Sequence, residues 1–233
     1  MRVMDPELSI IIPAYNEAEH LEKVVTELTA SLRGAGISHE ICVVDNGSSD
    51  GTLALVEKLA AEDPNVTYVH LEKNQHYGGG VLEGLKGARG AVIGWADADG
   101  QVDPKDIVRL YSKMMEEGKE LGKAVRIVRS DGHFRAIQTR IYNGIFSALF
   151  LTRYSDVNAK PKLLTRSAAE TLALCSRDYF LDPEFVIKAL RMRMSITEVE
   201  TTWRERQSGS TRIHALAGLS FLRSMLAYRF GIR

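Results

Sequence analysis

Four short apolar runs, separated by stretches of helical spacing, constrain the fold of this chain more than any other feature. The runs lie at 8–12, 41–44, 66–71 and 91–96. Apolar runs of this length, without strict alternation, are typical of strands buried on both faces. Strand and helix therefore alternate through the first half of the chain. This predicts an α/β fold with a doubly wound, mainly parallel sheet flanked by helices.

The chain after residue 104 is less regular but adds elements to the same core. Asp103-Pro104 is typical of a helix start, with proline at the first helical position. No repeat or low-complexity linker marks a boundary, so we expect one domain over 1–233. Its parts would be a first half to about 103, a second half over about 104–212 and a terminal helix over about 213–233. The other expected elements are strands at 124–128, 162–165 and 196–201 and helices at 141–151, 167–175 and 183–193.

Composition excludes several classes of protein. The 30 Lys and Arg residues balance 30 Asp and Glu residues, so no overall basic field favours nucleic acid. The N-terminus has no apolar signal core, and no run reaches the ~18 apolar residues of a membrane-spanning helix. Cys42 and Cys175 have neither metal spacing nor a disulfide framework, and we expect both to be reduced and buried in a cytoplasmic protein.

Two local signals predict how helices begin. Asn16 and Glu19 have the spacing of a capping box, which predicts Asn16 as the N-cap of the first helix. The glycines Gly78–Gly80 predict a turn that opens the third helix.

Polar clusters follow three of the apolar runs, at 13–17, 45–52 and 97–100. The carboxyl ends of parallel strands form the edge at which open α/β sheets bind ligands. Asp97 and Asp99 lie one residue apart before Gly100. Such hard oxygen ligands suit Mg²⁺ or Mn²⁺ shared with a phosphate-bearing substrate. By itself the pattern also fits a loop with two solvated aspartates.

Four motifs together carry a resemblance to a known family. They are PAYNE (13–17), VVDNGSSDGT (43–52), DADG (97–100) with Gln101 and Asp103-Pro104, and WRERQSGST (203–211). In this order they resemble family 2 glycosyltransferases over about residues 8–212. The similarity is greatest to the branch with dolichol-phosphate mannosyltransferase and the polyprenyl-phosphate sugar transferases.

The resemblance implies a GT-A fold and a defined reaction. A hexose would move from a UDP- or GDP-sugar to a polyprenyl or dolichyl phosphate in an inverting transfer, with Mg²⁺ or Mn²⁺ as cofactor. The first half would bind the donor and the second half the acceptor, at the cytoplasmic membrane face.

The resemblance also implies which residues bind the donor. Asp97, Asp99 and Gln101 would hold the metal, and Asp45 would hydrogen-bond the base. The further donor-binding residues would be Pro13, Ala14, Tyr15, Glu17, Asn46 and Ala98. Asn46 stands where the family often has a second aspartate, which leaves the nucleotide open. Asn46-Gly47 equally fits a plain turn.

Arginines supply the expected acceptor contacts. Arg129, Arg135 and Arg140 lie in a segment that resembles the acceptor-binding part of the family, and guanidinium groups suit phosphate oxygens. A solvated basic loop is the alternative. After the last strand, Arg206 and Ser210 would close over the donor diphosphate, whereas an exposed loop would have the same composition.

Asp182 has three interpretations. The family implies a general base at this position, but a phosphate acceptor is already an anion and needs none. It would otherwise organise the site, or cap a helix, which Asp182-Pro183 favours. The residues expected to act in catalysis are therefore Asp97, Asp99, Asp182 and Arg206.

Two further segments remain open. Asp156–Lys162 (DVNAKPK) departs from the glycine–aromatic–basic element of the branch, which leaves acceptor details undecided. The terminal helix is apolar with interleaved arginines, which fits a helix lying on a membrane surface and equally a core helix or dimer contact. His20, His39 and His70 show no ligand spacing and are interpreted as ordinary residues.

Other functions use the same features. The acceptor would be a water-soluble alcohol in one alternative. In another, less favoured, the chain would be a nucleotidyltransferase or a sugar-nucleotide binding protein without turnover. The sequence leaves the oligomeric state open.

Overall fold

The computed structural model describes residues 5–129, 144–150, 156–203 and 216–230. One seven-stranded sheet forms the centre, in the order β3-β2-β1-β4-β6-β5-β7. The strands are β1 Leu8–Ala14, β2 His39–Asp45, β3 Val66–His70, β4 Val92–Trp95, β5 Leu121–Arg129, β6 Lys162–Thr165 and β7 Ile196–Trp203. The helices are α1 Ala18–Gly34, α2 Thr52–Glu62, α3 His76–Gly87, α4 Pro104–Glu116, α6 Arg166–Leu172, α7 Leu181–Arg191 and α8 Leu216–Arg229.

Strand direction divides the sheet into two parts. We call β1–β4 the parallel half, because β1 pairs in parallel with β2 and β4, and β2 with β3. We call β5–β7 the mixed half: β6 runs antiparallel to both β4 and β5, whereas β5 and β7 are parallel. The carboxyl ends of β4 and β5 thus lie at the same edge as the amino end of β6.

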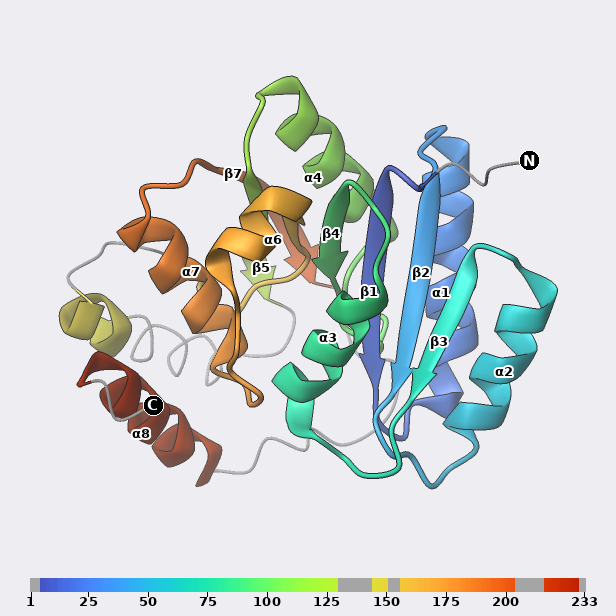
Figure 1. Cartoon of the computed structure of the whole chain (residues 1–233), viewed down its shortest axis with the longest axis horizontal. Coiled ribbons are helices and arrows are strands. Elements are labelled where there is room, and N and C mark those ends of the chain that lie inside the picture. The colour runs from blue at the N-terminus through green and yellow to red at the C-terminus, as the bar shows by residue number, and fades with distance from the viewer. Residues whose placement is uncertain (1–4, 130–143, 151–155, 204–215, 231–233) are drawn as a thin grey trace.

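The alternation of side chains in each strand produces two cores, one on each face of the sheet. Ile10 and Ile12 of β1 pack into the core that also contains residues of α1, α2 and α4. Ile11 points the other way, into the core under α3, α6 and α7. Figure 1 shows these helices on opposite sides of the sheet. β1, β2 and β4 are buried on both faces, as their apolar runs predicted, whereas only Val66 of the edge strand β3 is buried.

The predicted mainly parallel α/β fold is confirmed, and Asp103 caps α4 as predicted, its Oδ1 accepting a hydrogen bond of 2.9 Å from Lys105 N. Other local predictions are wrong. Glu17, not Asn16, is the N-cap of α1, since Asn16 has a left-handed backbone (φ 54°) and its Oδ1 accepts from Ser49 N instead. Cys42 is buried, but Cys175 is exposed and lies beyond α6.

Gly78–Gly80 lie inside α3 rather than in a turn before it. Their role is close packing: a Cβ at Gly78 would lie 2.3 Å from the carbonyl oxygen of Ser176. α3 can therefore approach the chain before α7 at backbone distance. No helix within the described ranges is long and apolar enough to cross a membrane.

Candidate active site

The carboxyl edge of the parallel half gathers residues from two neighbouring strands. Ala14 and Asp45 are register partners at the ends of β1 and β2. The loops that follow are tied together, because Asn16 N donates to Ser48 Oγ (2.9 Å) and Glu17 N to Thr52 Oγ1 (3.0 Å). Tyr15 keeps 38% of its surface exposed above them. The two polar clusters therefore form one surface, as the parallel arrangement predicted.

Asp45 is fully buried and has protein partners at both oxygens. Its Oδ1 accepts from Ser48 N (3.2 Å), and its Oδ2 lies 2.7 Å from Nδ1 of His70, at the end of β3. The imidazole of His70 is partly exposed. Sequence reasoning missed His70, although its place at the carboxyl end of a neighbouring strand was a usable signal.

Asn46 has a role inside the protein. Its Nδ2 donates to His76 O and its Oδ1 accepts from Gln75 N, both at 2.9 Å. The amide therefore ties the end of β2 to the start of α3, and a carboxylate could not make both bonds. This explains asparagine at the position. Its contact with a donor stays a prediction.

Asp97 and Asp99 follow β4 at the same edge. Asp97 is partly buried, Asp99 Oδ1 accepts from Gln101 N (3.1 Å), and Gly100 turns the chain with φ 74°. In the described part of the chain no three His, Cys, Asp or Glu side chains are grouped to hold a metal. Two carboxylates at a strand end still fit Mg²⁺ or Mn²⁺, because such ions commonly take one or two protein carboxylates and substrate phosphates.

Asp182 lies at the centre of a cluster of buried polar and charged side chains. It is 1% exposed, and its Oδ1 lies 2.8 Å from Lys162 Nζ and 3.2 Å from Trp95 Nε1. Its Oδ2 lies 3.1 Å from Lys160 Nζ. Burial alone raises the pKa of this carboxyl, but the two lysines outweigh it, so the pKa is lowered. Asp182 lies in the first turn of α7, whose N-cap is Phe180, so the favoured prediction of a helix cap is wrong.

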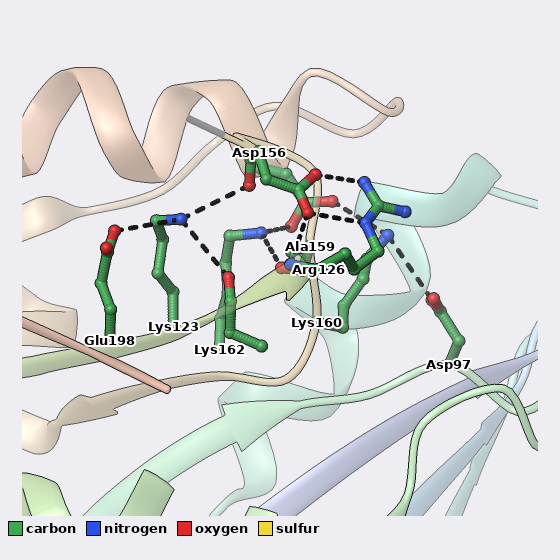
Figure 2. Close-up of polar contacts among 10 residues, drawn as sticks. Asp97, Lys123, Arg126, Asp156, Ala159, Lys160, Lys162 and Glu198 are labelled. Carbon is green, nitrogen blue, oxygen red and sulfur yellow. Dashed lines mark hydrogen bonds and ion pairs between the residues drawn. The ribbon is translucent and has the colours of Figure 1, made fainter. Parts of the chain in front are cut away.

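Lys160 joins this centre to the aspartates after β4. Its Nζ lies 3.6 Å from Asp97 Oδ1 and 4.6 Å from the ring centroid of Tyr77. Figure 2 shows the lysine extending to Asp97 from the segment before β6. Burial lowers the pKa of Lys160, but Asp182 and Asp97 outweigh it and raise the pKa. Burial lowers the pKa of Lys162 to about 8 despite Asp182.

Further charges continue from this centre into the mixed half (Figure 2). Asp156 accepts from the backbone N (2.9 Å) and from Nε (2.7 Å) of Arg126. The fully buried Lys123 lies 3.2 Å from Glu198 of β7. Arg126 also lies over the ring of Trp203, 4.3 Å from its centroid. The ends of β5 and β7 are thus connected to the segment that carries Lys160.

Sequence reasoning missed Lys160, Lys162 and Arg126. The usable signal was the pair of lysines at 160 and 162 in a segment that departs from the family element. Several predicted residues cannot be placed. Arg129 belongs to β5, but its side chain lies outside the described residues, as do Arg135, Arg140, Arg206 and Ser210 entirely.

Fold and site together define an α/β protein of GT-A type, with two carboxylates at the carboxyl edge of its parallel strands. Residues 9–182 match the family "Glycosyl transferase family 2". The chain belongs to this family, as the four motifs predicted.

Curated relatives point to one branch of the family. An undecaprenyl-phosphate 4-deoxy-4-formamido-L-arabinose transferase of Pseudomonas fluorescens (strain SBW25) is 29% identical over 94% of this chain and 63% of its own length. The enzyme of the same name from Serratia proteamaculans (strain 568) is 30% identical over 88% of this chain and 62% of its own. The chain thus spans somewhat less than two thirds of these relatives.

Solved structures confirm the fold. Glucosyl-3-phosphoglycerate synthase from Mycobacterium tuberculosis, in complex with Mn²⁺, UDP and glucosyl-3-phosphoglycerate, has a TM-score of 0.73 at 20% identity over 97% of this chain and 80% of its own. Mannosyl-3-phosphoglycerate synthase from Rubrobacter xylanophilus has a TM-score of 0.75 at 19% identity over 96% of this chain and 74% of its own. At these identities the likeness shows the fold alone.

Proposed function

We propose that this protein is a glycosyltransferase that moves a hexose from a UDP- or GDP-sugar to a polyprenyl phosphate. The curated relatives are named as transferases that act on undecaprenyl phosphate. A solved neighbour is complexed with UDP and Mn²⁺. The observation in this chain that supports the proposal best is the pair Asp97 and Asp99, at the edge where the ends of β1 and β2 also meet.

Each part of the site has a role in this reaction. Pro13–Tyr15, Glu17 and Asp45 would border the nucleoside. Asp97 and Asp99, with Gln101, would hold Mg²⁺ or Mn²⁺, which when bound stabilises negative charge on the diphosphate. The transfer would be inverting.

Asp182 suits the organising role better than that of a base. A phosphate acceptor brings its own negative charge and needs no proton acceptor. The carboxylate of Asp182 is already shared by Lys160 and Lys162, and its lowered pKa makes it a weak base. Its place in catalysis is then to hold Lys160, the lysine that lies beside Asp97.

The membrane contact of the terminal helix stays a prediction. The described part of α8 uses some of its apolar residues within the protein: Met225 is buried, and the Tyr228 ring lies 5.1 Å from that of Phe180. Leu226 and Phe230 are exposed and would be the groups to reach a lipid surface.

A water-soluble acceptor is the second candidate, favoured by a solved neighbour of the same fold in complex with phosphoglyceric acid and UDP-glucose.

The deciding experiment incubates the purified chain with UDP- and GDP-hexoses and either undecaprenyl phosphate in detergent or phosphoglyceric acid, with Mn²⁺, Mg²⁺ or a chelator. We expect sugar on the lipid phosphate and release of a nucleoside diphosphate, both lost in chelator.

Other outcomes would contradict the proposal in distinct ways. Transfer to the soluble acceptor alone would establish the second candidate. Release of pyrophosphate would indicate a nucleotidyltransferase. Saturable binding of sugar nucleotide without any product would indicate a binding protein. The anomeric configuration of the product tests inversion.

A further inference from the structure

Lys160 is more than a counter-charge for Asp182. Lys162 already forms a 2.8 Å contact with Asp182 Oδ1 and donates to Ala159 O at 2.7 Å, so this lysine alone neutralises the buried carboxylate. Lys160 adds a second positive charge at 8% exposure. Because a buried charge is costly unless it is paired, this excess charge needs a partner.

The only further carboxylate recorded beside Lys160 among the described residues is Asp97. Their separation of 3.6 Å exceeds hydrogen-bond length, so the ammonium group is attracted to Asp97 without being hydrogen-bonded to it. An ammonium group has three donors. Asp182 takes one of them, and the Tyr77 ring covers another side of the group.

A bound metal would change this balance. Two charges of a divalent cation would match those of Asp97 and Asp99, so neither carboxylate would still be available to balance Lys160. One positive charge, in surroundings of low dielectric constant, would then be left for a phosphate bound beside Asp97. Lysine binds phosphate as such a point charge, and a preorganised charge at this position stabilises a departing diphosphate.

We propose that Lys160 is a phosphate-binding residue, whose ammonium group hydrogen-bonds a phosphate oxygen of the donor diphosphate or of a phosphorylated acceptor beside Asp97. The inference rests on the proposed function for the identity of that phosphate. Asp182 is then a positioning residue, because it holds the ammonium group at the edge of the metal site.

The test compares two lysines of the same buried cluster. Lys160→Met removes the charge next to Asp97 and leaves Asp182 paired with Lys162. Lys162→Met is the matched control, because it removes another buried lysine that pairs with Asp182, whereas the ion pair with Asp97 belongs to Lys160. Thermal unfolding measures the structural cost of each, and Lys160→Gln replaces Lys160→Met if the latter does not fold.

Calorimetric titrations with Mn²⁺ present separate the phosphate sources. The probes are UDP and GDP for the donor, a short-chain prenyl phosphate for the acceptor, and inorganic pyrophosphate for phosphate without a nucleoside. Loss of a charge-assisted hydrogen bond weakens binding by roughly tenfold to a hundredfold. We expect this loss of affinity for Lys160→Met. For Lys162→Met the affinity should change by less than about threefold, because no hydrogen bond to the phosphate is lost. Weaker binding of nucleotide alone assigns the donor, and of prenyl phosphate alone the acceptor.

The inference would be overturned if wild type and Lys160→Met bound all phosphate probes with equal affinity. It would also be overturned if both variants lost affinity equally, because that result indicates a structural effect. A different result separates the two proposals. If the wild type binds pyrophosphate through Lys160 but neither nucleotide nor prenyl phosphate, the proposed function fails and the inference stands.

Discussion

The parallel half and the mixed half of the sheet place polar groups at the same edge by different means. In the parallel half the polar residues lie at or just after the carboxyl end of a strand: Asp45 is the last residue of β2, and Asp97 lies two residues after β4. In the mixed half, Lys160 lies just before β6 and Lys162 is its first residue. β6 is antiparallel to β4 and pairs Lys162 with Trp95. Because β6 begins at this edge, its first residues lie at the site. The strands of the parallel half end at this edge, so their last residues lie there.

The two halves also differ in what holds them together. Close packing of apolar groups dominates the parallel half, where α3 lies on β1 and β2. Ion pairs of buried lysine and arginine side chains connect the elements of the mixed half, through the buried Asp182 and Asp156 and the partly exposed Glu198. Loss of one partner should therefore be most damaging in the mixed half, because it leaves an unpaired buried charge.

The largest effect is expected for Asp182→Ala. This change leaves two lysines beside an empty position and should reduce the free energy of unfolding by about 3–5 kcal/mol. Urea unfolding followed by circular dichroism measures it. The matched control is Asp103→Ala, which removes the partly exposed N-cap of α4 and should cost only about 1 kcal/mol. A loss at position 182 no greater than in the control would contradict the importance of the buried pairs.

Asp99→Ala should affect function rather than stability. Loss of a metal-binding carboxylate should lower the transfer rate by a factor on the order of a hundred or more, because charge on the diphosphate is no longer stabilised. Unfolding should change little, since Asp99 is partly exposed. Rate assays with saturating Mn²⁺ and a parallel unfolding curve test this. Near-normal rates would remove Asp99 from the metal site.

Gly84→Ala tests the packing of the parallel half. A Cβ at Gly84 would lie 2.5 Å from Cγ2 of Ile11, so α3 must shift or Ile11 must change conformation. Such overpacking costs about 1–3 kcal/mol. Gly87→Ala is the control, because its Cβ would meet no atom within 4 Å and alanine favours the helix. Stability that rises equally in both variants would refute close packing at Gly84.

The smallest effect is the acid dependence of the Asp156–Arg126 pair. Burial raises the pKa of Asp156, but the hydrogen bonds and charge of Arg126 outweigh it, and the pKa falls below its usual 3.8. The pair should stabilise the protein fully above pH 3.8 and lose its effect as the pH falls through the lower folded value. The cost of Asp156→Asn should therefore shrink between pH 5 and pH 3. If the stability cost of Asp156→Asn instead grew as the pH falls, the pKa of Asp156 would be raised in the folded protein and not lowered.

The sequence predicted the parallel half in detail. Apolar runs marked all four strands, and Asp45, Asp97 and Asp99 were predicted to lie at one edge because the carboxyl ends of parallel strands meet there. Local capping was less predictable. Asn16 has the residue type and spacing of a cap, but contacts with the next loop gave it a left-handed backbone. His70 was missed because its partner Asp45 is 25 residues away.

The sequence by itself determined the order of strands and helices along the chain, the α/β class and the two carboxylates after β4. Each of these depends on periodicity or on residues that are neighbours in the chain. Only the tertiary structure decided that Lys160, Lys162 and Asp182 meet at those carboxylates. Their contact depends on β6 running antiparallel to β4 and on α7 starting above Trp95. Neither is encoded in a local pattern, since both arise from packing between segments far apart in sequence.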